Sequence, residues 1–500
     1  MRLRDWQQKC IKIALTKYNN NNNNNNTVKH FLTLATPGAG KTVMASVLAK
    51  KLYDKKLVDI ILCFSPSSVV SADFADELSL RFNSRFDGSI GALGDSYTYQ
   101  ALSTLNANVW QLFEQYRVFV IFDEIHHCAG SSIEDANSWG SPILNLIKEK
   151  AAFTLSLTGT PWRSDSLPIA LSNYCNESGQ INCDYVYGLK EAISDKVCRV
   201  PQIIALDNNK ITLTNSEETT TFTNFFELLK AKVISYSELV TNELVIENLL
   251  LRATAKLKEI RSINPKAGGL IVASSISHAH VINTIMRSKF SSSAIIVTSS
   301  ENEPDKIIKR FRQSDNEWLI SVGMVSEGTN IPRLQVCCNL TNYRTELYFR
   351  QILGRILRIT DSVNQDAFMF MPAEPNLIDF ALRVAENVPG ELGKVKIFDI
   401  EIENEKSIVL EPLDNSPKVL AEEGDLFDIN LDRLINNEKT TETNLKNNSK
   451  TPLAKVANNL TLDGDFNHRP INPVGLSELL LFDISDEAHA KLEQLNRIMI

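Results

Sequence analysis

The stretch ATPGAGKT at residues 35–42 constrains the fold of this chain more than any other part of the sequence. It follows an apolar run that predicts a strand, and it precedes VMASVLAKKL, which predicts a helix. Glycines in such a turn let backbone N–H groups converge on phosphate oxygens, and the N-terminus of the following helix adds positive potential. The sequence therefore predicts a strand, a phosphate-binding loop and a helix in succession.

This loop predicts a site for a nucleoside triphosphate and Mg²⁺. Lys41 is expected to neutralise the β- and γ-phosphates, and Thr42 is expected to place its hydroxyl on Mg²⁺. The residues expected to surround the phosphates are Thr36, Pro37, Gly38, Ala39, Gly40, Lys41 and Thr42.

Two carboxylates end another apolar run, in the stretch VFVIFDEIH. The carboxyl edge of a parallel sheet is where ligands bind in open α/β folds. Asp123 is therefore expected to hold Mg²⁺ through its water shell, and Glu124 to polarise an attacking water as general base. A phosphate loop and an acidic strand end also fit a GTPase, a kinase of small molecules or a transporter ATPase.

Short apolar runs alternate with helix-like stretches in two blocks of the chain. Such uninterrupted runs are typical of parallel strands that helices cover on both faces. This pattern predicts two doubly wound α/β units. The expected strands are 31–35, 58–64, 118–122 and 153–157 in the first block, and 269–273, 294–298, 318–322 and 336–340 in the second.

The change of pattern along the chain predicts its divisions. These are a first domain at 1–199, an inter-domain segment at 200–262, a second domain at 263–385 and an acidic carboxy-terminal extension at 386–500. The extension is expected to be of mixed, partly flexible structure, with a linker at about 436–459 that is rich in Asn, Thr and Lys.

Charge is distributed unevenly. Residues 401–500 contain 19 Asp and Glu against 10 Lys and Arg, which accounts for the net charge of −8, and the rest is nearly neutral. A neutral body can still carry a local basic groove, so the net charge does not exclude a nucleic-acid partner.

Membrane and secretion signals are not expected. The chain has no run of 18 or more apolar residues, and its first residues lack the apolar core of a signal peptide. The eight cysteines form no CxxC pair and are interpreted as reduced thiols. These features predict a cytoplasmic protein without membrane partners.

An ordered series of motifs resembles that of the superfamily 2 DEAD/DEAH-box (DExH) helicases and translocases, which include DNA recombination helicases and the motors of type I and type III restriction enzymes. Besides the two motifs above, the series consists of LRDWQ at 3–7, FSPSS at 64–68, TYQAL at 98–102, LTGTPWR at 157–163, GGLIVASSISHA at 268–279, SVGMVSEGTNIP at 321–332 and QILGRILR at 351–358. The resemblance implies two tandem RecA-like domains of the P-loop NTPase type, with ATP and Mg²⁺ as ligands.

The resemblance also implies roles for individual residues. Gln7 is expected to read the adenine base, and Gly328 and Asn330 to contact the nucleotide, although many relatives carry Asp at the Asn330 position. The residues expected to couple hydrolysis to domain movement are His126, Thr158 and Thr160. Those expected to contact the nucleic-acid strand are Ser67, Thr98, Ser274 and Ser275.

QILGRILR predicts a helix that places Arg355 one turn from Arg358, with both side chains on one face. By resemblance, both arginines are expected to reach the γ-phosphate from the second domain and stabilise transition-state charge. Gln351 is expected near the phosphate or the attacking water.

These observations predict an ATP-hydrolysing helicase or translocase. DNA is the preferred track over RNA, because LTGTPWR resembles the form found in DNA-directed members. The alternatives are a motor subunit that needs protein partners in a restriction, defence or mobile-element complex, a non-translocating ATP-switched clamp, and an RNA helicase. The amphipathic end of the carboxy-terminal extension, at 476–500, is interpreted first as packing on the second domain and, as the alternative, as a place for a protein partner to dock.

Overall fold

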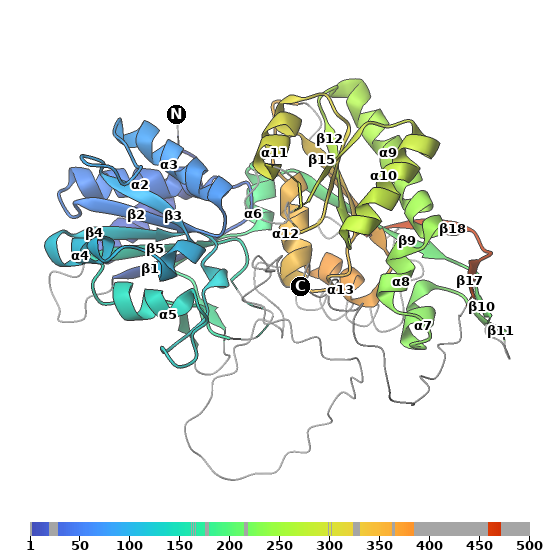
Figure 1. Cartoon of the computed structure of the whole chain (residues 1–500), viewed down its shortest axis with the longest axis horizontal. Helices are drawn as coiled ribbons and strands as arrows, with labels where there is room; N and C mark the ends of the chain where they lie inside the picture. The colour runs from blue at the N-terminus through green and yellow to red at the C-terminus, as the bar shows by residue number, and fades with distance from the viewer. Residues whose placement is uncertain are drawn as a thin grey trace, which may run out of the picture.

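The computed structural model describes two α/β units that lie side by side, each with a mainly parallel sheet between helices (Figure 1). The described residues are 3–19, 29–161, 163, 165, 167–175, 180–214, 219–298, 300–301, 303–323, 331–362, 366–384 and 459–471. The predicted fold class of two parallel-sheet α/β domains is confirmed.

The first sheet has six parallel strands in the order β3-β2-β4-β5-β1-β8. Their bounds are β1 (His30–Ala35), β2 (Ile60–Ser65), β3 (Gly94–Thr98), β4 (Val118–Phe122), β5 (Phe153–Thr158) and β8 (Tyr185–Tyr187). The central strands β4 and β5 are buried along their whole length, as expected of strands that helices cover on both faces.

Alternate residues of the strands pack against different helices. Phe119 and Ile121 of β4 belong to the cluster formed with α1 (Asp5–Asn19), α2 (Lys41–Asp54) and α3 (Ser68–Phe82). Val118 and Val120 belong to the cluster of the opposite face. That face is covered by α4 (Ala107–Gln115) and by α5 (Gly140–Pro142), which continues as a π-helical turn over Ile143–Ile147. Because successive side chains of a strand point to opposite faces, the sheet is packed between two layers of helices.

The second sheet has seven strands in the order β13-β14-β12-β15-β16-β9-β18. Their bounds are β9 (Val200–Asn208), β12 (Gly268–Ala273), β13 (Ala294–Val297), β14 (Trp318–Ser321), β15 (Leu334–Leu340), β16 (Asp366–Pro372) and β18 (Phe466–Ile471). The helices of this unit are α7 (Phe225–Lys230), α8 (Tyr236–Thr241), α9 (Glu243–Ile263), α10 (Ile276–Phe290), α11 (Pro304–Gln313), α12 (Glu346–Ile356) and α13 (Pro375–Arg383). In Figure 1, α9 and α10 lie on the outer side and α11 and α12 face the first domain. No helix in the described part of the chain is long and apolar enough to span a membrane.

The segment 200–262, expected between the domains, is largely built into the second domain. Its first residues form β9, which pairs in parallel with β16. Its last residues form α9, which packs on β15 and β16. The apolar side chains of both elements are buried in the same core, and this burial explains why they join the sheet.

Part of the predicted carboxy-terminal extension also joins this sheet. β18 pairs antiparallel with β9, from Phe466 opposite Asn208 to Ile471 opposite Ile203. β17 (Asn459–Leu462) pairs with β10 (Ile211–Thr214), which also pairs with β11 (Thr219–Phe222). The rest of the extension, including the predicted linker except Asn459, lies outside the described residues.

Candidate functional site

The phosphate loop connects β1 to α2, which begins at Lys41. Gly38 and Gly40 have φ angles of +82° and +92°, a region that residues with a Cβ rarely adopt. The sequence therefore turns here because it has glycine at both positions, and the turn directs the N-terminus of α2 into a cavity between the two domains.

Side chains from the start of the chain hold the carbonyl groups of this loop. Arg4 donates from Nη1 to the carbonyl oxygen of Ala39 at 2.7 Å, and Trp6 donates from Nε1 to the same oxygen at 3.2 Å. Gln7 donates from Nε2 to the Gly40 carbonyl at 2.9 Å. Arg4 and Trp6 were not predicted as site residues, although both belong to the LRDWQ motif that contains Gln7.

Gln7 is bonded within the protein at both ends of its amide. Its Oε1 accepts from the backbone N–H of Arg4 at 2.9 Å, and the side chain is buried. This geometry joins Gln7 to the phosphate loop, and its contact with adenine stays a prediction.

The acidic pair follows β4 at the carboxyl edge of the first sheet. Lys41 Nζ lies 2.7 Å from Glu124 Oε1, and the backbone N–H of Gly159 donates to Glu124 Oε2 at 2.9 Å. Burial raises the pKa of the Glu124 carboxyl, but Lys41, His126 and the Gly159 hydrogen bond outweigh it and lower the pKa to about 2. Glu124 is therefore a carboxylate at neutral pH, and phosphate groups in the cavity would compete with it for the Lys41 ammonium.

Asp123 and Thr42 line the same cavity as Lys41. Asp123 is buried to 8% exposure, and its backbone N–H donates to the Phe64 carbonyl of β2 at 2.8 Å. A carboxylate and a hydroxyl at the mouth of a phosphate loop are oxygen donors of the kind that Mg²⁺ prefers, so these side chains fit the predicted role.

His126 contacts residues of both domains. Its Nδ1 lies 2.9 Å from Thr158 Oγ1 and 3.4 Å from Thr160 Oγ1 in the first domain. Its Nε2 lies 3.4 Å from Nε2 of Gln351, which is on α12 of the second domain. Since the Gln351 amide nitrogen can only donate, this contact favours the imidazole tautomer that carries its proton on Nδ1.

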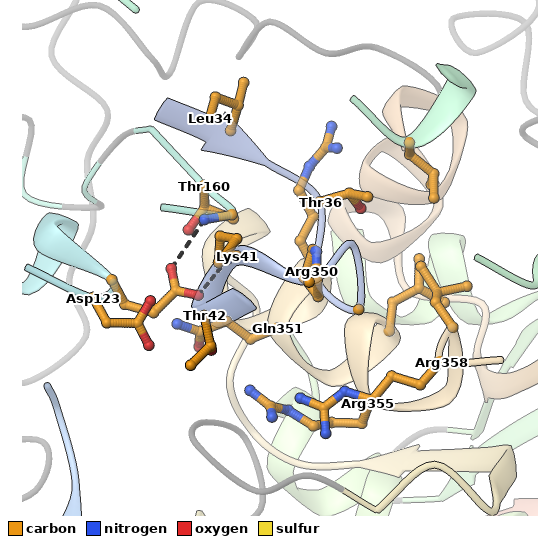
Figure 2. A pocket seen from close by; sticks show the side chains of 18 of the residues that line it. Leu34, Thr36, Lys41, Thr42, Asp123, Thr160, Arg350, Gln351, Arg355 and Arg358 are labelled. Atoms are coloured by element: carbon orange, nitrogen blue, oxygen red, sulfur yellow. Dashed lines mark hydrogen bonds and ion pairs between the residues drawn. The ribbon is translucent and has the colours of Figure 1, made fainter. Parts of the chain in front are cut away.

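The second domain contributes Gln351, Arg355 and Arg358 to the cavity (Figure 2). Gly354 permits the close approach of α12, because a Cβ there would lie 2.7 Å from Cγ of Pro37 in the phosphate loop. Helix α12 therefore contacts the phosphate loop at Gly354, the residue before Arg355.

The prediction that Arg355 and Arg358 share one helix is wrong. Helix α12 ends at Ile356, and Arg358 instead forms an isolated β-bridge with Cys198. Both arginines still line the cavity. Burial, together with Arg355 and Arg312, lowers the pKa of Arg358 to about 9.

The cavity has a volume of about 340 Å³, which is within the range of small-ligand sites. The predicted residues that line it are Thr36, Pro37, Gly38, Gly40, Lys41, Thr42, Asp123, Glu124, Thr160, Gln351, Arg355 and Arg358. Arg4 and Asp73 also line it and were not predicted. Gly328 and Asn330 lie outside the described residues.

The residues predicted to contact nucleic acid do not line this cavity. Ser67 caps α3 and Ser275 caps α10, each accepting from a backbone N–H of its helix. Ser274 Oγ lies 2.7 Å from His278 Nδ1, and Thr98 is the last residue of β3. All four follow or end parallel strands at the carboxyl edges of the sheets, and their contact with a nucleic acid stays a prediction.

Comparisons with known proteins match each of the two α/β domains to a separate family model. The model described as "Type III restriction enzyme, res subunit" matches residues 1–163, and that described as "Helicase conserved C-terminal domain" matches residues 252–360. An uncharacterized protein of Mycobacterium tuberculosis is 28% identical over 393 residues, which are 76% of this chain and 62% of the relative. This chain therefore spans just under two thirds of that relative.

Two further proteins resemble the chain. The DNA 3'-5' translocase XPB2 of Sulfurisphaera tokodaii is 24% identical over 404 residues, which are 72% of this chain and 79% of the relative. A solved fragment assigned as an HsdR subunit of a type I restriction enzyme from Vibrio vulnificus has a TM-score of 0.51 at 16% identity, and the match covers 76% of this chain and 65% of the fragment. The second likeness is one of fold alone.

Proposed function

We propose that this chain is a superfamily 2 helicase or translocase that uses ATP hydrolysis to move along DNA. The matches to a restriction-enzyme res subunit and to a helicase carboxy-terminal domain support this proposal. One observation carries the proposal. The cavity that holds Lys41 and Glu124 of the first domain is closed by Arg355 and Arg358 of the second. A site shared in this way makes hydrolysis dependent on how the two domains are arranged.

In this proposal ATP binds with its phosphates at the loop, and Lys41 exchanges the Glu124 carboxylate for the β- and γ-phosphates. The released carboxylate of Glu124 then accepts a proton from the water that attacks the γ-phosphorus. The bond between the γ-phosphorus and the β–γ bridging oxygen breaks, so that ADP leaves and inorganic phosphate forms. Mg²⁺, held by Thr42 and Asp123, would neutralise phosphate charge. Glu124 is ionised at neutral pH, as a base must be, and moving Lys41 to the phosphates removes the largest interaction that lowers its pKa, which makes the carboxylate more basic.

Coupling to movement is proposed to run through His126. Its imidazole joins Thr158 and Thr160 to Gln351, so a change at the acidic strand end alters a contact between the domains. When Glu124 and Lys41 rearrange around the products, the Gln351 contact is expected to loosen and the domains to separate.

DNA is proposed as the track, with Ser67, Thr98, Ser274 and Ser275 as contacts to the strand's phosphates. Hydroxyl groups at helix N-termini can bind phosphate without reading sequence. The TGTP form of the coupling motif supports DNA, and so does the likeness to a relative named as a DNA translocase.

The test is ATP hydrolysis by the full chain with no nucleic acid, single-stranded DNA, duplex DNA, forked DNA or RNA. Stimulation by DNA is the expected result, followed by displacement of an oligonucleotide or of a triplex strand. Stimulation by RNA alone would replace this proposal with an RNA helicase. DNA-stimulated turnover without displacement of either kind would favour an ATP-switched clamp.

A motor subunit of a larger complex is the second candidate. The acidic composition of residues 401–500 favours it, because a segment of this charge is unsuited to a DNA track and complements a basic protein partner. Removing everything after about 385 would also remove β17 and β18, which pair with β10 and β9. A chain that ends after Ile471 keeps both strands and is the sharper test. Its ATP turnover and its binding to protein partners are compared with those of the full chain.

Arg355→Ala is expected to lower ATP turnover by roughly 10³-fold, with little change in ATP affinity. The reason is that this cation is proposed to bind phosphate most strongly when charge builds up in the transition state. Turnover kinetics and binding of a fluorescent ATP analogue separate the two effects. Arg287→Ala, at an exposed arginine in the last turn of α10, is the matched control. Equal losses of turnover in both variants would exclude a specific role for Arg355.

A further inference from the structure

Arg199 lies where the chain passes from the first domain into β9 of the second. Its side chain is fully buried, with 0% exposure. Burial of a guanidinium is destabilising unless hydrogen bonds replace its lost hydration, and here burial lowers the pKa of Arg199 to about 10. The hydrogen-bond acceptors of the Arg199 guanidinium therefore show which part of the structure this side chain stabilises.

The guanidinium binds the end of the helix that carries Arg355. Nη1 donates to the carbonyl oxygen of Leu334 at 2.6 Å and to that of Ile356, the last residue of α12, at 3.2 Å. Nη2 donates to Oγ1 of Thr360 at 3.3 Å. The last carbonyl groups of a helix have no partner within the helix and carry partial negative charge, so a cation is stabilising at this position. Arg199 thus fixes both the end of α12 and the turn that follows it.

The backbone of residues 198 and 199 also pairs with the segment that follows α12. The N–H of Arg199 donates to the carbonyl of Leu357 at 2.8 Å, and Cys198 forms a β-bridge with Arg358. Cys198 Sγ lies 3.3 Å from the Pro37 carbonyl oxygen of the phosphate loop. Residues 198 and 199 therefore connect the loop of the first domain to the 355–358 segment of the second.

We propose that Arg199 is a positioning residue that holds the segment 355–358, and with it Arg355 and Arg358, at the phosphate loop. This inference rests on the proposed function, because positioning matters only if those arginines act on the nucleotide. Arg199 itself donates to two backbone carbonyls and a threonine hydroxyl and does not line the cavity. Its loss should therefore displace the arginines without removing a phosphate contact.

The experiment compares Arg199→Met and Arg199→Lys with the wild-type full chain in ATP hydrolysis. Methionine keeps an unbranched apolar stem and removes the cation, so kcat is expected to fall roughly 10- to 100-fold, the effect of a small displacement of a catalytic group. KM for ATP is expected to change much less, because the loop and Lys41 are retained. Lysine can reach one of these acceptors but lacks the planar fork, so Arg199→Lys should recover part of kcat.

Arg333→Met is the matched control for general destabilisation. Arg333 is also buried, and it donates to the carbonyl oxygens of Lys266 at 2.8 Å and Asn316 at 2.6 Å, within the second domain. Both methionine variants are expected to lower the melting temperature. Only Arg199→Met is expected to lower kcat when both are assayed well below that temperature.

The outcomes are distinguishable. Turnover in folded Arg199→Met close to that of the wild type would overturn this inference alone, as would an equal loss of kcat in Arg333→Met. If Arg199→Met does not fold, Arg199→Lys decides, and an unchanged kcat in that variant overturns the proposal. If Lys41→Ala hydrolyses ATP as fast as the wild type does, the proposed function is overturned as well.

Discussion

Replacing Lys41 with alanine is expected to abolish ATP turnover, with a loss of at least about 100-fold, while the fold is retained. The side chain supplies the cation beside Glu124 at the start of α2, and it is the cation proposed to neutralise the β- and γ-phosphates. Alanine is a good helix former, so α2 should be preserved. Turnover of ATP and binding of a labelled nucleotide measure the loss, and circular dichroism checks the fold.

The geometry adds a second consequence of this change. Without the Lys41 ammonium, the Glu124 carboxyl loses the largest of the interactions that hold its pKa down, so its pKa should rise. In the proposed mechanism the same rise accompanies ATP binding, when Lys41 moves to the phosphates, so the loss of turnover is attributed to the missing phosphate contact. Lys51→Ala, at an exposed position of the same helix, is the control and should behave as wild type. Normal turnover in Lys41→Ala would show that this loop is not the hydrolytic site.

Glu124→Gln is expected to reduce turnover by about 10²- to 10⁴-fold while ATP still binds. An amide has nearly the shape of the carboxylate and can still accept from the Gly159 N–H, but it cannot take a proton from water. The domains should therefore close on ATP and remain closed. If closure promotes strand binding, the variant should bind DNA more tightly in the presence of ATP than the wild type does.

Single-turnover hydrolysis and an ATP-dependent DNA-binding titration test this pair of effects. The matched control is Glu114→Gln on α4, where an exposed glutamate pairs with Lys150 at 3.4 Å. A Glu124→Gln chain that hydrolyses ATP normally would assign the base role to another group. Lost turnover with unchanged DNA binding would separate catalysis from the closure of the domains.

Several features could be predicted from the sequence because each depends on a short, continuous stretch. ATPGAGKT follows an apolar strand, and its glycines permit the observed backbone angles of Gly38 and Gly40. DEIH follows an uninterrupted apolar run, and such runs are strands when helices cover both faces. Strand periodicity and turn chemistry are local properties, so the two-domain fold was correctly expected, and twelve of the predicted site residues line the cavity.

Other features were decided by contacts between residues far apart in the chain. β18 joins the second sheet beside β9, although FNHRPI has no apolar run and lies more than 250 residues from its partner strand. Helical periodicity placed Arg358 on α12, but pairing with Cys198 ends the helix before it. Neither result is encoded in local spacing, because each depends on which distant backbone supplies the hydrogen bonds.

The sequence by itself determined the chemical groups of the site, since a phosphate loop, an acidic strand end and an arginine-bearing segment are recognisable one at a time. Only the tertiary structure decided how they meet. It placed Lys41 on Glu124, brought Gln351 to His126 and buried Arg199 against the end of α12. Burial is the physical reason, because a buried polar group must find its partner in space, and that partner can lie anywhere along the chain.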